Sequence, residues 1–126
     1  MNLREIAAAD APDAQSYAQG IEVTDAKRIL IISGQIPVAR DGTVPAGFEA
    51  QAQLAWANVI AQIMAAGMTL DNLAKVTIFL SDRKYIASYR KARDAALGGR
   101  RVALTTIICG IFDEGWLLEI EAIAVA

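Results

Sequence analysis

The stretch WLLEIEAIAVA, residues Trp116 to Ala126, closes the chain and is apolar except for two glutamates. Successive side chains of a strand point to opposite faces, so Glu119 and Glu121 share one face of the strand that this stretch predicts. Their apolar neighbours on that face are Leu117, Ile123 and Val125. A carboxylate among apolar side chains needs a partner or a function. The segment therefore indicates both a core strand and a candidate site.

Other segments predict the strands that could pair with it. RVALTTIIC, residues 101–109, is separated from the last strand by the turn GIFDEG, residues 110–115, which predicts a C-terminal hairpin. Near the N-terminus, SYAQGIEV (16–23) and RILIISGQIPV (28–38) predict a second hairpin through residues 24–27. NLAKVTIFL, residues 72–80, alternates and is rich in β-branched residues, as strands are.

Two helices are predicted between these strands. From residue 48 the apolar period changes to that of a helix, which Gly67 ends. Its apolar stripe consists of Phe48, Ala52, Ala55, Trp56, Val59, Ile63 and Ala66. The second helix starts at an N-cap, Ser81 or Asp82, and stops at Gly98-Gly99.

The resulting order, ββαβαββ, predicts an α+β fold with one mixed sheet and two helices on one face. We expect residues 1–126 to form a single domain, given the size of the chain. Two helices cover only one face of a sheet, and several strands are apolar on both faces. We therefore expect an oligomer that covers the second face.

Composition narrows the possible chemistry. The chain has no histidine, which excludes the common Ser/His/Asp and Cys/His nucleophile systems. The single cysteine, Cys109, has no partner for a disulfide or a zinc site, and we expect no metal and no cofactor. Proton chemistry must then use carboxylates, tyrosine, lysine or water.

Charge and hydropathy indicate a soluble, cytoplasmic protein. No apolar run reaches the ~18 residues of a membrane span, and a signal peptide is not evident at the start. The net charge is −2 with pI about 5.0, which argues against a nucleic-acid partner. Seven of the twelve Lys and Arg residues lie between Arg83 and Arg101, and a solvated helix face accounts for most of them.

Several short sequence motifs occur in an order and at a spacing typical of one protein family. They are AP at 11–12 with Tyr17, SGQIP at 33–37, Gln51 with Asn58 and Gly67, LDNLAKVTIFLSD at 70–82, Arg101, and LEIEAIA at 118–124. Nearly end to end, the chain resembles the Rid family (also called the YjgF/UK114 family) of small trimeric proteins. The resemblance implies a chorismate-mutase-like fold and a homotrimer with clefts between subunits.

In the active branch of that family, the resemblance further implies hydrolysis of reactive enamines or imines, such as 2-aminoacrylate, to a keto acid and ammonia. Arg101 would hold the substrate carboxylate and Glu119 would handle the water. Tyr17, Ser33 and Gly34 would line the pocket. Where that branch commonly carries an asparagine, this chain has Arg90. This cation would either favour a dianionic or larger substrate or mean that 2-aminoacrylate is not the natural one.

The residues suit that chemistry. An imine carbon is already electrophilic, so hydrolysis needs a positioned water and a proton carrier more than a strong nucleophile. Arg101 offers a planar charged fork that can bind a carboxylate in two places. Structural alternatives remain: Arg101 in an ion pair, Glu119 and Glu121 paired across an interface, Tyr17 as a packing residue.

Two other functions stay open. The clefts could bind a small carboxylate metabolite without catalysis, or the chain could be an endoribonuclease, which its acidic pI and lack of stacking aromatics argue against. Within a C-terminal hairpin, Arg101 and Glu119 would be staggered by five residues, about 17 Å. We therefore predict that each pocket joins Arg101 of one subunit to Glu119 of a neighbour, unless a β-bulge re-aims one of the two side chains.

Overall fold

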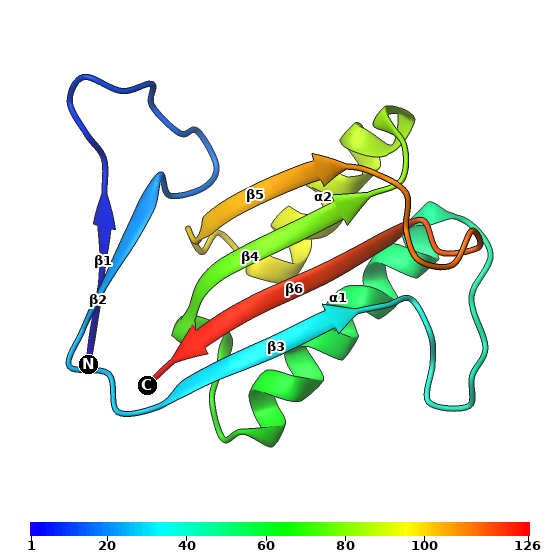
Figure 1. Cartoon of the computed structure of the whole chain (residues 1–126), viewed down its shortest axis with the longest axis horizontal. Helices are drawn as coiled ribbons and strands as arrows, with labels where there is room; N and C mark the ends of the chain where they lie inside the picture. Colours follow the sequence, from blue (N-terminus) through cyan, green and yellow to red (C-terminus); the bar gives the residue numbers. More distant parts are fainter.

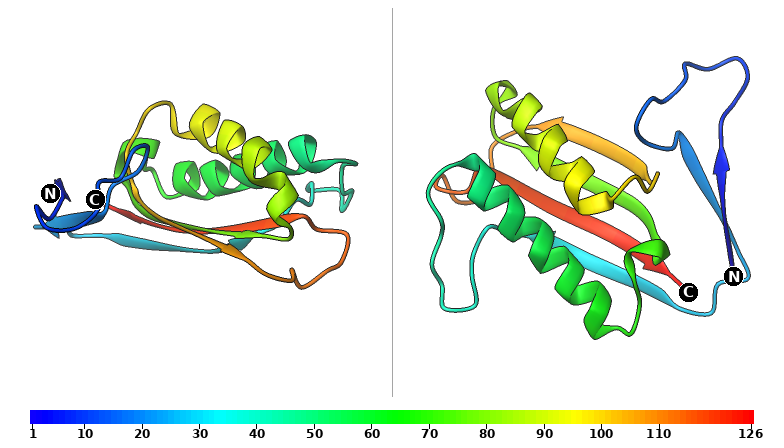
Figure 2. Two further views of the ribbon diagram at one scale, coloured as in Figure 1. Left: turned by 90° about the horizontal axis from the view of Figure 1, so that it is seen from above. Right: turned by 180° about the vertical axis from the view of Figure 1, so that it is seen from behind.

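The computed structural model describes residues 1–126 and places a four-stranded sheet at the centre of the molecule (Figure 1). Its strands lie in the order β3-β6-β4-β5, and only the β4–β5 pair is parallel. Their bounds are β3 Ile29–Gln35, β4 Leu73–Leu80, β5 Ala103–Ile108 and β6 Leu118–Val125. Two helices, α1 Phe48–Ala65 and α2 Ile86–Leu97, cover one face of this sheet (Figure 2). The predicted α+β class, with both helices on one face of a mixed sheet, is confirmed.

Both helices lie where the apolar period predicts them. The stripe of α1 is buried from Phe48 to Ile63, and the chain leaves the helix through Gly67 at a positive φ of 72°. Helix α2 buries Tyr89, Arg93 and Leu97 and ends at Gly98 in the left-handed conformation. Two short 3₁₀ helices, Leu70–Asn72 and Arg83–Tyr85, precede β4 and α2. None of the helices has the length and apolar character needed to traverse a lipid bilayer.

Strand β6 lies between β3 and β4, so the predicted C-terminal hairpin is wrong. Strand β5 pairs in parallel with β4, and the loop from residue 109 to 117 carries the chain past β4 to the other side. The even-numbered residues of β6 are buried beneath the helices: Leu118, Ile120, Ala122 and Ala124. A strand this apolar gains most where both of its edges are paired, whereas β5 with its two threonines tolerates the exposed edge.

The N-terminal region forms a separate two-stranded ribbon. Strand β1 (Asn2–Ile6), which the sequence did not predict, pairs with β2 (Gly20–Thr24), and this ribbon stands beside one end of the sheet (Figure 1). The predicted hairpin between β2 and β3 is therefore wrong. Asp25 adopts a left-handed conformation (φ 58°) after β2, and the backbone of Arg28 exchanges hydrogen bonds with that of Ala126. The chain thus enters β3 already paired with the C-terminal strand.

The face of the sheet opposite the helices is open in the single chain. It carries exposed apolar side chains: Ile29 at 67%, Ile31 at 77%, Ile107 at 42% and Ile123 at 37%. Glu119 and Glu121 lie on the same face, so they are not in the core beneath the helices; Glu119 is half-buried and Glu121 exposed. The strands carry apolar residues on both faces, as expected. That another subunit covers the open face stays a prediction.

Candidate active site

Arg101, just before β5, already holds a carboxylate. Its Nε lies 3.1 Å from both carboxylate oxygens of Glu5, and its Nη2 donates to Glu5 Oε1 at 2.9 Å. The two side chains are each 37% exposed, so this ion pair lies at the surface. Hydrogen bonding to Arg101 holds the pKa of Glu5 below its ordinary value, and the same contact raises the pKa of Arg101.

The remaining donors of Arg101 hold the loop that precedes β2. Nη1 donates to the carbonyl oxygen of Gln15 at 2.8 Å. Nη2 donates to that of Tyr17 at 2.8 Å. The next residue, Ala18, donates its backbone N–H to the carbonyl oxygen of Val102 at 2.9 Å. Arg101 therefore lies against the backbone of Tyr17, and its guanidinium organises the loop that carries Tyr17.

Arg93 supports this loop from behind, and sequence reasoning assigned it no role at the site. It is only 5% exposed, and its Nη2 donates to Ser16 Oγ at 2.9 Å. Its Nη1 contacts the hydroxyl of Tyr89, one helical turn earlier, at 3.3 Å, and Nε bonds Asp94. The available signal was an arginine in line with Tyr89 on the apolar stripe of a helix, since a buried arginine needs such partners.

Glu119 belongs to a second group at the other end of the sheet. Its side chain lies against Gly34, where an added Cβ would stand 1.9 Å from Glu119 Oε1. Ser33 and Gly34 form a bulge in β3 between Ile32 and Gln35. The structure therefore places Glu119 beside Gly34, with Ser33 as the preceding residue of the bulge. Neither Glu119 nor Glu121 forms an ion pair within the chain.

Two amides of α1 position the loops around the Glu119 group. Gln51, only 4% exposed, donates to the carbonyl oxygen of Gly115 at 3.0 Å and accepts from the N–H of Leu117 at 2.8 Å. Asn58 donates to the carbonyl oxygens of Ile36 and Val38 at 2.9 and 3.1 Å. Both residues belong to the blocks that carry the family resemblance. Their contacts show that they fix the loop after β3 and the entry to β6.

The two groups lie far apart within one chain. Across the sheet, Phe79 is in register with both Glu119 and Ile107. Arg101 lies six residues before Ile107, which corresponds to about 20 Å along the strands. The C-terminal hairpin, from which the distance between Arg101 and Glu119 was inferred, is wrong. The parallel pairing of β5 with β4 also keeps these two residues apart. One chain alone does not bring Arg101 and Glu119 around a small substrate.

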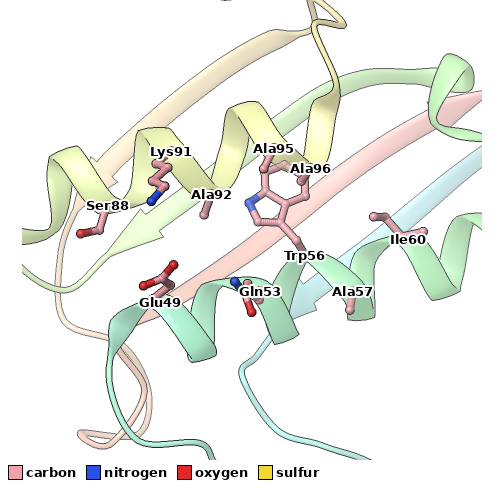
Figure 3. A pocket seen from close by; sticks show the side chains of 10 residues that line it. All are labelled: Glu49, Gln53, Trp56, Ala57, Ile60, Ser88, Lys91, Ala92, Ala95 and Ala96. Atoms are coloured by element: carbon pink, nitrogen blue, oxygen red, sulfur yellow. The ribbon is translucent and has the colours of Figure 1, made fainter.

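A separate groove of about 400 Å³ lies between α1 and α2, on the helical layer (Figure 3). Alanines line much of it, Trp56 lies between the helices, and Glu49 and Lys91 face each other from opposite helices. It contains none of the predicted site residues. No three His, Cys, Asp or Glu side chains converge anywhere in the chain as a metal site would require.

Comparison with known proteins identifies the family. The family described as "Endoribonuclease L-PSP" matches residues 8–126. The 2-iminobutanoate/2-iminopropanoate deaminase of Escherichia coli is 34% identical over 127 residues, covering 97% of each chain. The chain is a member of the Rid family.

Solved structures of other Rid proteins have the same fold. The Rid-family protein YyfB from Yersinia pestis superposes with a TM-score of 0.88 over 100% of both chains, at 23% identity. Escherichia coli TdcF, solved with bound serine, superposes with a TM-score of 0.73 over 98% of both chains, at 30% identity. The predicted family membership is therefore confirmed.

Proposed function

We propose that this Rid-family chain is a deaminase that hydrolyses 2-imino acids, and the enamines that tautomerise to them, in pockets between the subunits of a homotrimer. The observation that carries the proposal is the 34% identity, over 97% of both chains, to a 2-iminobutanoate/2-iminopropanoate deaminase. Serine bound to TdcF, a second relative, is a small carboxylate with a nitrogen on the adjacent carbon.

The reaction consumes one water and releases one ammonia. Water adds to the carbon of the C=N bond, and the proton it loses passes to a base. In the resulting tetrahedral intermediate the nitrogen gains a proton and the C–N bond breaks to release ammonia. The hydroxyl gives up its proton as the C=O bond forms, leaving a 2-keto acid. The electrophile is already reactive, so positioning and proton transfer supply the acceleration.

The candidate residues divide these tasks. Arg101 holds the substrate carboxylate through its guanidinium fork. Glu119 accepts the proton from the attacking water and returns it to the leaving nitrogen. Gly34 lets backbone and Glu119 approach closely, because any side chain at this position would meet the carboxylate. Tyr17 and Ser33 line the two ends of the pocket.

The pocket would close only on assembly. Arg101 and Glu119 lie about 20 Å apart along the strands of one chain. A neighbouring subunit docked on the open sheet face would bury the exposed isoleucines of that face. The neighbour's Glu119 would then lie opposite Arg101 of the first subunit. The separation of the Arg101 group from the Glu119 group therefore supports a site that two subunits complete.

An assay that generates 2-aminoacrylate and follows ammonia or pyruvate tests the activity. Wild type should accelerate release, and Arg101→Ala should reduce kcat/KM at least about 100-fold, with Arg101→Lys between them. Arg4→Ala is a matched control, since Arg4 pairs with Glu22 on the exposed surface of the ribbon. Saturable binding of keto acids without any acceleration would instead favour a non-catalytic binding protein.

Subunit mixing tests the shared pocket. Arg101→Ala and Glu119→Gln should each be inactive alone. In trimers reassembled from equal amounts of both, about one quarter of the pockets would combine an intact Arg101 with an intact Glu119. Activity near one quarter of the wild-type value is expected. A reassembled mixture as inactive as either variant would contradict the two-subunit pocket.

A further inference from the structure

Arg101 is occupied by an internal carboxylate before any ligand arrives. Glu5 takes the Nε and one Nη2 donor, and the carbonyl oxygens of the 14–17 loop take others. A guanidinium has five N–H groups, so no free pair remains for a bidentate ligand. An external carboxylate must therefore displace Glu5 to bind the fork in two places.

Once displaced, the Glu5 carboxylate cannot move far. Its backbone is fixed in β1, in register with Ile21 of β2. The Arg101 guanidinium is held by the carbonyl oxygens of Gln15 and Tyr17. A ligand bound to Arg101 therefore has a negative charge beside it, and this charge favours a cationic group on the ligand.

The hollow next to the Glu5–Arg101 pair is lined by both acidic and basic side chains. It measures about 290 Å³ and is lined by Glu5, Arg101, Arg100 and Asp71 together with apolar side chains from β1, β2 and β4. Arg100 donates to Asp71 at 2.7 Å, so a second acid–base pair faces the same space. Such a surface suits a small molecule that carries a positive and a negative group on the same carbon atom.

We propose that Glu5 is a specificity-determining residue, which makes the Arg101 site prefer zwitterionic 2-imino and 2-amino acids over 2-keto acids. This inference rests on the proposed function, because it takes Arg101 as the carboxylate anchor. A 2-imino acid carries an iminium nitrogen next to its carboxylate, whereas the 2-keto acid product carries only the negative charge. Glu5 therefore favours binding of substrate and release of product.

The test compares pyruvate with L-alanine, which share a carbon skeleton and differ in the cationic nitrogen. Titration calorimetry on the full-length protein gives a dissociation constant for each ligand. Glu5→Gln should shift the preference toward pyruvate by about fivefold, while Glu5→Asp should keep most of the wild-type preference. Glu22→Gln is the matched control: it breaks the exposed Arg4–Glu22 pair on the same ribbon and should change the preference by less than about twofold.

The outcomes separate this inference from the proposed function. If Arg101→Ala abolishes binding of both ligands but Glu5→Gln leaves their ratio unchanged, the role of Glu5 is wrong and the carboxylate anchor stands. If Arg101→Ala leaves both affinities unchanged, or wild type binds neither ligand, the anchor fails and the inference with it.

If Glu5→Gln unfolds the β1–β2 ribbon, a measurement on the wild-type protein still tests the inference. The carboxyl carbon of Glu5 can be followed by NMR while pH is varied, with and without saturating pyruvate. Bound pyruvate should raise the pKa of Glu5, because Glu5 loses Arg101 and gains an anionic neighbour. L-Alanine should raise it less. A Glu5 pKa that does not move at saturation overturns the proposal.

Discussion

Arg101 and Glu119 depend on their surroundings in different ways. Arg101 uses nearly all its donors on Glu5 and on loop carbonyl oxygens, so it organises the loop as well as offering charge. Glu119 has no ion-pair partner within the chain and is positioned by the absence of a side chain at Gly34. Glu119 should therefore be sensitive to small steric changes nearby.

Gly34→Ala should disable the site without unfolding the protein. The new methyl group would stand 1.9 Å from Glu119 Oε1, so the carboxylate must rotate away, while the backbone at Gly34 has no positive φ to strain. A displacement of about 1 Å can cost a reaction about 100-fold, and we expect a fall in kcat of that order. Gly110→Ala, where a Cβ meets nothing within 4 Å, is the control. Wild-type turnover by Gly34→Ala would argue against a catalytic Glu119.

At the scale of elements, α1 holds the loop that leads into β6. Gln51 makes three hydrogen bonds, to Pro45, Gly115 and Leu117, from a buried position. No apolar side chain could satisfy the backbone groups that it serves. The amide therefore couples the helix to the strand that carries Glu119.

Gln51→Ala should lower the free energy of unfolding by about 2–3 kcal/mol, because it leaves buried backbone groups without partners. Urea unfolding at fixed protein concentration measures the loss. Gln53→Ala, on the exposed face of the same helix, should change it by no more than about 0.5 kcal/mol. Equal effects of the two substitutions would show that the buried hydrogen bonds of Gln51 do not stabilise the fold.

The ribbon formed by β1 and β2 should loosen in acid. Arg101 holds the pKa of Glu5 below its ordinary value of 4.5, so the ion pair contributes its full stability above pH 4.5. That contribution is lost as pH falls through the lowered pKa. The stability difference between wild type and Glu5→Gln should therefore be constant above pH 4.5 and shrink below it. Asp41, whose pKa is lowered by hydrogen bonds from Thr43, titrates alike in both proteins and cancels.

Thermal unfolding of both proteins between pH 6 and pH 3 provides the comparison. Limited proteolysis of the ribbon over the same range reports local release. A difference between the two proteins that grows on acidification would contradict the assigned sign.

For the whole molecule, the open sheet face is the feature that a single chain leaves unexplained. Four isoleucines on it are at least 37% exposed, whereas the opposite face is covered by both helices. The proposed homotrimer would bury them and complete the pocket at the same time. Assembly and activity should therefore be lost together.

Ile31→Glu should yield a folded monomer without deaminase activity. Ile31 is 77% exposed in the chain, so the charge disturbs an interface and leaves the core intact. Size-exclusion chromatography with light scattering measures the mass, and circular dichroism verifies the fold. Met64→Glu, at a 67% exposed position on the helical layer, should remain a trimer. A monomeric wild type would overturn the proposed assembly.

The sequence alone determined the two helices and the family. Helical period is a local property, so the buried faces of α1 and α2 and the ends at Gly67 and Gly98 followed from neighbouring residues. The family resemblance implied one pocket that contains Arg101, Glu119, Tyr17, Ser33 and Gly34. The structure places Glu119 beside Gly34, and Arg101 beside the backbone of Tyr17.

Only the tertiary structure decided which strands pair and which side chain meets Arg101. Both predicted hairpins are wrong, because adjacency along the chain favoured local pairs while burial placed the apolar β6 between β3 and β4. Glu5 lies 96 residues before Arg101, and no local pattern reports a contact across that distance. Periodicity reveals which face of an element is apolar, but pairing between distant segments depends on how the whole chain buries those faces.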